Sequence, residues 1–251
     1  MLPVDRQGKV VRYVQKKGKT TVEELAAQFS VSSATVRRDV DVLSEQRLIR
    51  KAYGCVLAMD YALPGEIPIQ EKSSRCREEK QKIGRTAAGF VADGDTIIID
   101  SGTTTRAMAE QLTGSNLTVI TNDLQIALAM ERNPTAAVYL AGGLVEKSVG
   151  ATIGTSVVEW IRSFRVKTAF IGADAIDPKQ GVSDRTLEDV AIKRAMADAA
   201  ERTIVLADHT KFGDPVFARV GLLDRIDALI TDRISDEMKA EFEKAGVKVI
   251  V

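Results

Sequence analysis

The chain has 251 residues, of which 45% are hydrophobic, and its 35 basic side chains equal its 35 acidic ones in number. This length and content predict a soluble globular protein with one small and one larger domain. No apolar run approaches the roughly 20 residues of a membrane-spanning helix, and the N-terminus lacks a secretory apolar region, so we expect a cytoplasmic protein without a membrane partner. One histidine excludes a histidine-based catalytic triad within one chain, and two distant cysteines predict neither a metal site nor a disulfide framework.

The segment from Thr20 to Leu48 predicts two short helices joined by a tight turn. The first helix is expected over residues 22–29, with apolar residues at the i, i+3, i+4, i+7 spacing of one buried face. Thr21 offers an N-cap, and Glu24 completes a capping box three residues later. Ser32 or Ser33 can cap the second helix. Two helices in this arrangement are typical of a DNA-binding helix-turn-helix.

The second helix has a small, hydroxylated and basic N-terminal half. Its buried stripe is expected at Val36, Val40 and Leu43, which turns Ala34 and Arg38 toward the opposite side. Arginine can make bidentate hydrogen bonds to guanine, and hydroxyl groups can bind phosphates or bases. The alternative is an ordinary surface helix in which Arg37 pairs with Asp41. The predicted DNA contacts from the helix pair are Thr21, Ser32, Ser33, Ala34, Thr35, Arg37 and Arg38.

Residues 48–57 predict a β-hairpin that turns at Tyr53 and Gly54, beside the second helix. This hairpin would be the wing of a winged helix, and it adds Arg50, Lys51 and Tyr53 to the predicted DNA contacts. Residues 1–60 hold 11 basic and 7 acidic side chains, which leaves 24 basic and 28 acidic for the remainder. A basic head on an acidic body places the attraction for phosphate at the predicted DNA-binding helix.

The predicted domains are a head over residues 1–58, a linker over 59–72 and a body over 73–251. The linker contains Pro64, Gly65 and Pro68 and has no helical period. A helix from Glu71 to Val91 is expected to lead into the body, where short apolar strands then alternate with helices to the C-terminus. This alternation predicts an α/β fold with a mostly parallel sheet covered on both faces.

Several predicted strands end in small and polar residues, at the edge of the sheet where α/β proteins bind ligands. Residues 100–105 read Asp-Ser-Gly-Thr-Thr-Thr, so a tight turn and hydroxyl groups precede a helix that can face an anion. Glycine, asparagine and aspartate simply making turns is the alternative for any one loop. The combined loops predict a small phosphorylated ligand, bound by Asp100, Ser101, Gly102, Thr103, Thr104, Thr105, Thr121, Asn122, Asp123, Gly142, Gly143, Gly172, Asp174 and Lys211.

The chain resembles DeoR-type bacterial transcriptional regulators over nearly its whole length. The resemblance rests on TVEELAAQFSVSSATVRRDVDVLSEQRLIRK, IIIDSGTTT, VITN, LAGG, FIGAD and VLADHTKFG, which occur in the family's order. It implies a winged helix-turn-helix followed by an effector domain similar to ribose-5-phosphate isomerase and glucosamine-6-phosphate deaminase. It also implies a repressor of sugar or polyol genes that a phosphorylated intermediate releases from DNA. The wing departs from the family's His-Gly-Gly run, because this chain has Tyr53-Gly54-Cys55.

The main alternative is a sugar-phosphate isomerase-like enzyme with Asp174, Asp177 and Glu188 as acid or base residues. Against it, the lysine and glycine-run segment expected after such a strand appears only as Lys179-Gln180-Gly181, and the head would have no purpose. A winged helix used only for protein contacts would leave its basic residues unexplained. We therefore expect a regulator without a cofactor or catalytic residues, which binds operator DNA as a homodimer or homotetramer.

Overall fold

The computed structural model describes the whole chain except residues 1–2, 46–47, 53–54, 59–68 and 222. The chain divides into two compact units, Met1–Glu66 and Ile67–Val251, which are described separately below. Within the described residues, none of the helices is both long enough and apolar enough to span a lipid bilayer.

The first unit is a winged helix-turn-helix. Its elements are α1 (Pro3–Lys17), β1 (Lys19–Thr21), α2 (Val22–Phe29), α3 (Ser33–Glu45), β2 (Ile49–Ala52) and β3 (Cys55–Ala58). Strand β3 pairs antiparallel with both β1 and β2, so the predicted hairpin is confirmed and gains a third strand from residues that precede α2. Helix α1 and strand β1 were not predicted.

The two predicted helices of the head have the expected caps and buried faces. The Thr21 hydroxyl accepts the Glu24 N–H, and the Glu24 carboxylate accepts the Thr21 N–H, which completes the capping box. The Ser32 hydroxyl accepts the Thr35 N–H and so caps α3. The predicted stripe of α3 packs with Leu25 of α2 in one apolar core, which also includes residues of α1 and of the wing.

The second unit contains the remaining helices and strands. The helices are α4 (Ile69–Ser74), α5 (Arg77–Ala88), α6 (Thr103–Ala109), α7 (Leu124–Met130), α8 (Thr155–Arg162), α9 (Leu187–Ala199) and α10 (Asp236–Lys244), with two 3-10 turns, η1 (His209–Lys211) and η2 (Leu223–Arg225). The strands are β4 (Thr96–Ile99), β5 (Thr118–Thr121), β6 (Ala137–Leu140), β7 (Leu144–Glu146), β8 (Ala151–Ile153), β9 (Val166–Gly172), β10 (Ala175–Asp177), β11 (Gly181–Asp184), β12 (Ala200–Leu206), β13 (Ala218–Gly221), β14 (Ala228–Ile230) and β15 (Lys248–Ile250).

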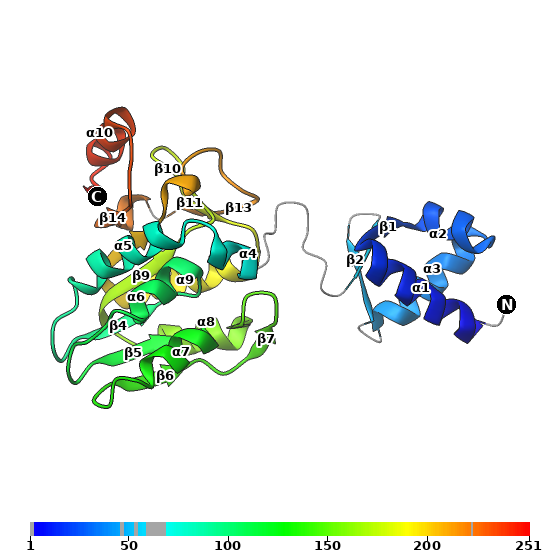
Figure 1. Cartoon of the computed structure of the whole chain (residues 1–251), viewed down its shortest axis with the longest axis horizontal. Coiled ribbons are helices and arrows are strands. Elements are labelled where there is room, and N and C mark those ends of the chain that lie inside the picture. Colours follow the sequence, from blue (N-terminus) through cyan, green and yellow to red (C-terminus); the bar gives the residue numbers. More distant parts are fainter. Residues whose placement is uncertain (1–2, 46–47, 53–54, 59–68, 222) are drawn as a thin grey trace. The chain divides into compact units, whose positions relative to one another are not determined.

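Seven of these strands form a parallel sheet in the order β15-β14-β12-β9-β4-β5-β6. Helices α5, α6 and α7 pack their apolar side chains on one face, and α8, α9 and α10 pack on the other (Figure 1). The central strands are buried on both faces, which explains their continuous apolar sequences. The predicted α/β fold is thus confirmed.

The order of the strands places a topological switch point between β4 and β9. From β4 the chain proceeds outward to β5 and β6, then returns to β9 on the other side of β4. The loops that follow β4 and β9 therefore leave the sheet side by side, and this is the place where open α/β sheets bind ligands. The residues that follow these two strands are Asp100 to Gly102 and Ala173-Asp174.

The fold of the second unit and its start differ from the prediction in three places. The single helix expected over residues 71–91 is two helices, α4 and α5, because Cys76 between them has the left-handed backbone conformation with φ +51°. Helix α4 begins at Ile69, inside the segment predicted as linker. A hairpin of β7 and β8 and a small antiparallel sheet of β10, β11 and β13 were not predicted, since their strands have only three or four residues.

Candidate functional site

Helix α3 presents the side chains that sequence analysis assigned to DNA. Ser32, Ala34, Arg37 and Arg38 are exposed, while Ser33 and Thr35 are half-buried. Arg6 of α1 donates to Asp39 at 2.5 Å from Nε to Oδ2, and Asp39 is buried on the inner side of α3. This contact holds the inner side of α3 against α1, and the basic residues of α3 face outward. An exposed basic helix beside a wing can enter a major groove.

The wing residues are described only in part. Arg50 and Lys51 lie on β2, which pairs with β3, but their side chains and the whole of Tyr53 lie outside the described part of the structure. The Thr21 hydroxyl is already used in the capping box of α2. The assignment of Thr21 as a DNA contact stays a prediction, and so do the assignments of the wing residues.

In the second unit, the loop after β4 has the predicted form of a turn that leads into a helix. Gly102 has φ +152°, a conformation that favours glycine, and it precedes α6. Thr105 donates its hydroxyl hydrogen to the Gly102 carbonyl at 2.9 Å. Thr104 and Thr105 are buried, whereas Ser101, Gly102 and Thr103 are half-buried. Solvent therefore reaches Ser101 to Thr103, the first half of this loop, but not the two threonines that follow.

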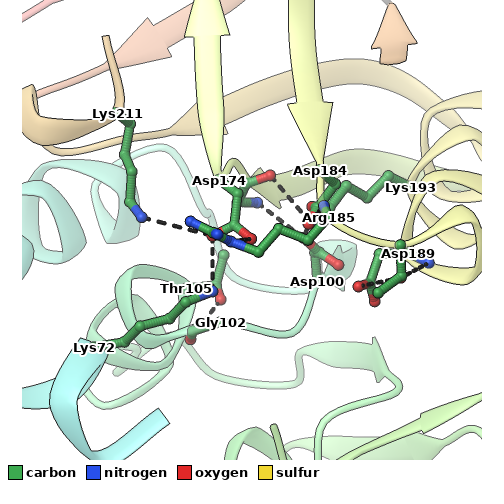
Figure 2. A network of polar contacts seen from close by, with 12 residues as sticks. Lys72, Asp100, Gly102, Thr105, Asp174, Asp184, Arg185, Asp189, Lys193 and Lys211 are labelled. Carbon is green, nitrogen blue, oxygen red and sulfur yellow. Dashed lines mark hydrogen bonds and ion pairs between the residues drawn. The ribbon is translucent and has the colours of Figure 1, made fainter. Parts of the chain in front are cut away.

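Asp174, after β9, lies among three cations (Figure 2). Lys72 of α4 donates to Asp174 Oδ1 at 2.7 Å, and Arg185 donates to Oδ2 at 2.9 Å. The predicted anion-binding residue Lys211, in η1, has its ammonium nitrogen 3.6 Å from Asp174 Oδ1. Burial by itself works to raise the pKa of Asp174, but Lys72, Lys211 and Arg185 outweigh burial and hold that pKa well below its usual range. This cluster, called here the Asp174 cluster, has three cations for one carboxylate.

A second ion cluster lies deeper, around Lys193 of α9 (Figure 2). Lys193 donates to Asp100 and to the Gly172 carbonyl, and its ammonium nitrogen is 3.2 Å from Asp184 Oδ2. Asp100 also accepts the Gly172 N–H at 2.9 Å. We call this group the Lys193 cluster. It places Asp100 and Gly172, both predicted as effector contacts, in a buried network that ties β4, β9 and α9 together.

The charges of the Lys193 cluster depend on one another. Burial works to lower the pKa of Lys193, but Asp100, Asp184 and Asp189 outweigh it and raise that pKa far above its ordinary value, so the ammonium stays charged. Burial raises the pKa of Asp184 to about 6, although Lys193 opposes this shift. Two carboxylates share one buried cation, which leaves the cluster with a surplus of negative charge.

The residues after β5 form a third polar group. Asp123 is fully buried, caps α7 and pairs with Arg106 at 2.9 Å, and its N–H donates to the Thr121 hydroxyl. The Asn122 amide donates to the Thr152 carbonyl at 3.0 Å. Among the described residues, no group hydrogen-bonds to the buried oxygen Oδ1 of Asn122. A buried amide oxygen without a partner is energetically costly, so this oxygen needs a hydrogen-bond donor that the described residues do not supply.

Gly142 and Gly143 lie farther from the switch point. They follow β6, the edge strand, which β5 separates from β4. A Cβ atom on Gly143 would approach the Ile153 carbonyl oxygen to 3.1 Å, so this glycine permits close packing against β8. The structure thus does not bring these two glycines into the Asp174 cluster.

A polar cavity of about 580 Å³ opens beside the first threonine of α6. Its lining includes Arg77, Lys80, Arg106 and Arg132, with Glu110 as the acidic residue. Thr103 is the predicted site residue that takes part in this lining. The volume suits a small metabolite, but Asp174 and Lys211 do not line it. Apart from Thr103, the predicted site residues do not line this cavity.

Sequence analysis missed four residues of the two ion clusters. Lys72 was assigned to the linker, and Asp184 and Arg185 belong to or follow an unpredicted strand, so their sequence gave no signal. For Lys193, by contrast, the sequence did contain a signal. Lys193 lies three residues after Val190 and four before Ala197, on the apolar stripe of α9, where a charged residue must have a buried partner.

The residues proposed for the enzyme alternative have other contacts. Asp177 Oδ1 accepts the N–H groups of Lys179 and Gln180, each at 2.8 Å, and so closes the turn between β10 and β11. Glu188 is exposed in the first turn of α9. Asp174 is held as a carboxylate by three cations, which makes it a weak base.

Comparisons with known proteins identify the family. The DeoR-like helix-turn-helix domain matches residues 6–61, and the DeoR C terminal sensor domain matches residues 75–233. The HTH-type transcriptional repressor GlcR of Bacillus subtilis is 34% identical over 100% of this chain and 97% of its own length. The glycerol-3-phosphate regulon repressor of Escherichia coli is 32% identical over 92% of each chain.

Solved structures with a similar fold are distant. The sorbitol operon regulator SorC of Klebsiella pneumoniae has a TM-score of 0.43 and 15% identity, and the match covers 96% of this chain and 99% of SorC. Ribose-5-phosphate isomerase of Methanocaldococcus jannaschii has a TM-score of 0.41 and 15% identity over 55% of each chain. Such values carry no argument about activity. The curated relatives are transcriptional regulators rather than enzymes, which confirms the non-enzymatic assignment. The chain belongs to the DeoR family of helix-turn-helix transcriptional regulators.

Proposed function

We propose that this chain represses an operon for the uptake or breakdown of a sugar or polyol, and that a phosphorylated sugar bound to its sensor domain releases it from DNA. The observation that carries the proposal is the surplus of cations in the Asp174 cluster, beside the Ser101–Thr105 loop. Lys72, Arg185 and Lys211 bring three positive charges to one carboxylate. A phosphate monoester carries about two negative charges near neutral pH, which matches this surplus.

Polar groups at the neighbouring strand ends suit the rest of a sugar phosphate. The first half of the loop after β4 offers hydroxyl and backbone groups to phosphate oxygens. Asn122 Oδ1, buried and without a partner among the described residues, would accept a hydrogen bond from a sugar hydroxyl. Asp174 would accept a second one. The ligand is thus expected to carry a phosphate and several hydroxyl groups.

The DNA-binding step rests on the exposed residues of α3. Arg37 and Arg38 would read base edges or phosphates in the major groove, with Ser32 to Thr35 at the N-terminal end of the helix close to the backbone. Arg50, Lys51 and Tyr53 of the wing would contact the flanking backbone. The protein would act in the cytoplasm as a homodimer or homotetramer, because paired heads fit repeated half-sites.

A thermal-shift screen with the full chain tests the effector proposal. Phosphorylated sugars and polyols are compared with the same compounds without phosphate. A phosphorylated ligand at about 100 times its dissociation constant should stabilise the protein by about 2.7 kcal/mol, and its unphosphorylated parent should not. Lys211→Ala should abolish the shift, whereas Lys147→Ala, in the exposed turn between β7 and β8, should retain it. Equal shifts with both compounds would refute the phosphate site.

Fluorescence anisotropy with the upstream DNA tests the repressor proposal. Arg38→Ala should weaken binding by about 1–3 kcal/mol if Arg38 contacts a base, or lower the salt slope by about 1 if it contacts a phosphate. Arg162→Ala, an exposed arginine in the sensor unit, is the control and should change neither. An Arg38 variant that keeps the wild-type affinity and salt slope would show that Arg38 does not contact DNA. The ligand found by thermal shift should then lower the anisotropy of the wild-type complex.

A further inference from the structure

We propose that Cys76, Asp208 and His209 form a binding site for a transition-metal ion, with Zn²⁺ as the best match. The three residues come from different parts of the sensor unit. Cys76 lies between α4 and α5, Asp208 follows β12, and His209 begins η1. Their sulfur, oxygen and nitrogen donor atoms all lie within 4.8 Å of one another. One small ion can contact all three donors after modest side-chain rotation.

The backbone holds two of the three donors in place. Cys76 has φ +51° immediately before α5, and this backbone conformation sets the direction of its Cα–Cβ bond. Asp208 is buried, and its Oδ1 accepts the Thr210 N–H at 3.0 Å and also the Thr210 hydroxyl. The turn uses only Oδ1, and the other carboxylate oxygen of Asp208 would bind the metal. The donors are thus positioned before any ion arrives.

His209 has the second partner that metal-binding histidines usually have. Its Nδ1 is 2.8 Å from Asp232 Oδ2, and its backbone N–H donates to Asp232 Oδ1 at 2.7 Å. A carboxylate behind the ring orients a ligating imidazole and makes it more basic. Nε2 now contacts Arg233 at 2.6 Å, and the Arg233 side chain is 71% exposed, against 6% for Asp232. Arg233 is the partner that can leave when a metal binds.

The donor set selects the kind of ion. A thiolate, an imidazole and a carboxylate together suit Zn²⁺ and its analogue Co²⁺ better than Mg²⁺ or Ca²⁺, which prefer oxygen ligands only. Three protein ligands leave one tetrahedral position for water. Burial, with Asp208 and Glu79 nearby, raises the pKa of the Cys76 thiol, so the metal displaces a proton, which passes to solvent. Thiolate and carboxylate then neutralise the two charges of the ion.

The Lys80 ammonium group interacts electrostatically with both Cys76 and Asp208. It donates to the carbonyls of Lys72 and Arg75, and burial lowers its pKa. Lys80 is thus directed to backbone oxygens that compensate its charge. The site has no residue in common with the Asp174 cluster, although His209 and Lys211 both belong to η1.

Co²⁺ titration of the full chain, without a polyhistidine tag, tests the proposal. Coordination by a thiolate produces a sulfur-to-cobalt charge-transfer band in the near ultraviolet, and coordination by oxygen and nitrogen alone does not. The wild type should develop this band up to one equivalent of Co²⁺, and Zn²⁺ should abolish it by displacement. Cys76→Ser should lose the band. Cys55→Ser is the matched control, because Cys55 is the other cysteine of the chain, and it should keep the band.

A second variant guards against a folding defect in Cys76→Ser. His209→Gln removes a nitrogen ligand and leaves both cysteines, and it should weaken Zn²⁺ binding in calorimetry by about 10-fold or more. Circular dichroism establishes that each variant is folded. No charge-transfer band in the wild type would overturn the proposal. A band of equal strength in Cys76→Ser, or unchanged Zn²⁺ affinity in folded His209→Gln, would overturn it as well.

Discussion

The two ion clusters at the carboxyl edge of the sheet have opposite surpluses of charge. In the Lys193 cluster, Asp100 and Asp184 share one ammonium group, and all three side chains are at most 8% exposed. In the Asp174 cluster, three cations share one carboxylate, and their side chains are 17–22% exposed. The clusters are neighbours in the fold (Figure 2), but the cations of the second are more exposed than any side chain of the first.

We infer from this difference that the Lys193 cluster stabilises the fold and that the Asp174 cluster binds the ligand. Lys193 has buried oxygen partners at Asp100, Gly172 and Asp184, so its cluster joins the ends of β4, β9 and β11 to α9. The Asp174 cluster has more positive charge than its own carboxylate can neutralise. An excess of positive charge at a half-open position is what an anionic ligand requires. The two clusters should therefore respond differently to mutation, to pH and to phosphate.

The largest expected effect is on stability. Lys193→Met should lower the free energy of unfolding by about 3–5 kcal/mol, because it leaves Asp100 and Asp184 buried without their cation. Urea unfolding measures this as a lower midpoint with an unchanged slope. The control is Arg225→Met, which breaks an exposed pair with Asp198 and should cost about 1 kcal/mol or less. Equal losses in both variants would contradict a supporting role for the Lys193 cluster.

The two clusters should also respond to pH with opposite signs. The pKa of Asp184 is raised to about 6 in the folded protein, so its contribution makes stability fall as pH rises from about 4 to about 6. The pKa of Asp174 is lowered, so its stabilisation is present above the ordinary carboxyl pKa of about 4 and is lost as pH falls below it.

The test compares the free energy of unfolding against pH for the wild type, Asp184→Asn and Asp174→Asn. Asp184→Asn should remove a slope of up to about 1.4 kcal/mol per pH unit between pH values of about 4 and 6. Asp174→Asn should instead reduce the loss of stability below a pH of about 4. If both variants change the curve in the same window, the two clusters do not differ as described.

The smallest expected effect is on anion binding. Asp174→Asn removes the carboxylate that competes with phosphate for Lys72, Arg185 and Lys211, so inorganic phosphate should bind about 10-fold more tightly, about 1.4 kcal/mol. Isothermal titration calorimetry measures the change. Asp177→Asn is the control, because Asp177 closes a turn and contacts none of these cations. Unchanged phosphate affinity in Asp174→Asn would show that the cations are not available to an anion.

Periodicity and local caps made the helix-turn-helix and the main strands predictable, whereas α1 and β1 of the head were missed. The capping box of Thr21 and Glu24 and the apolar stripe of α3 depend on residues three or four positions apart, and the structure has both. The short apolar strands of the sheet were also found, because strands buried on both faces need apolar side chains throughout. Short antiparallel pairs such as β10 with β11 were missed, since three or four residues show too little alternation.

The candidate site was predictable where it lies in loops after the central strands. Asp100, Ser101 to Thr105 and Asp174 follow β4 and β9, and parallel strands bring their carboxyl ends to one edge. Their separate roles were not predictable. Asp100 and Asp174 both follow such strands, yet Asp100 is held by Lys193 below the site while Asp174 is held by three cations within it. The depth at which each carboxylate is buried decides between these roles. That depth depends on α9, which carries Lys193, and on α4, which carries Lys72.

The sequence by itself determined the helix-turn-helix, the strands of the parallel sheet, the order of the two units and the strand ends where polar residues gather, because these follow from local spacing and from the sheet edge. Only the tertiary structure decided which charges meet. Lys72 and Asp174 are 102 positions apart, and Asp100 and Lys193 are 93 apart. Cys76 reaches Asp208 and His209 in the same way. Electrostatic attraction and metal coordination act over a few ångströms of space, and no local pattern in a sequence reports which distant side chains the fold brings within that range.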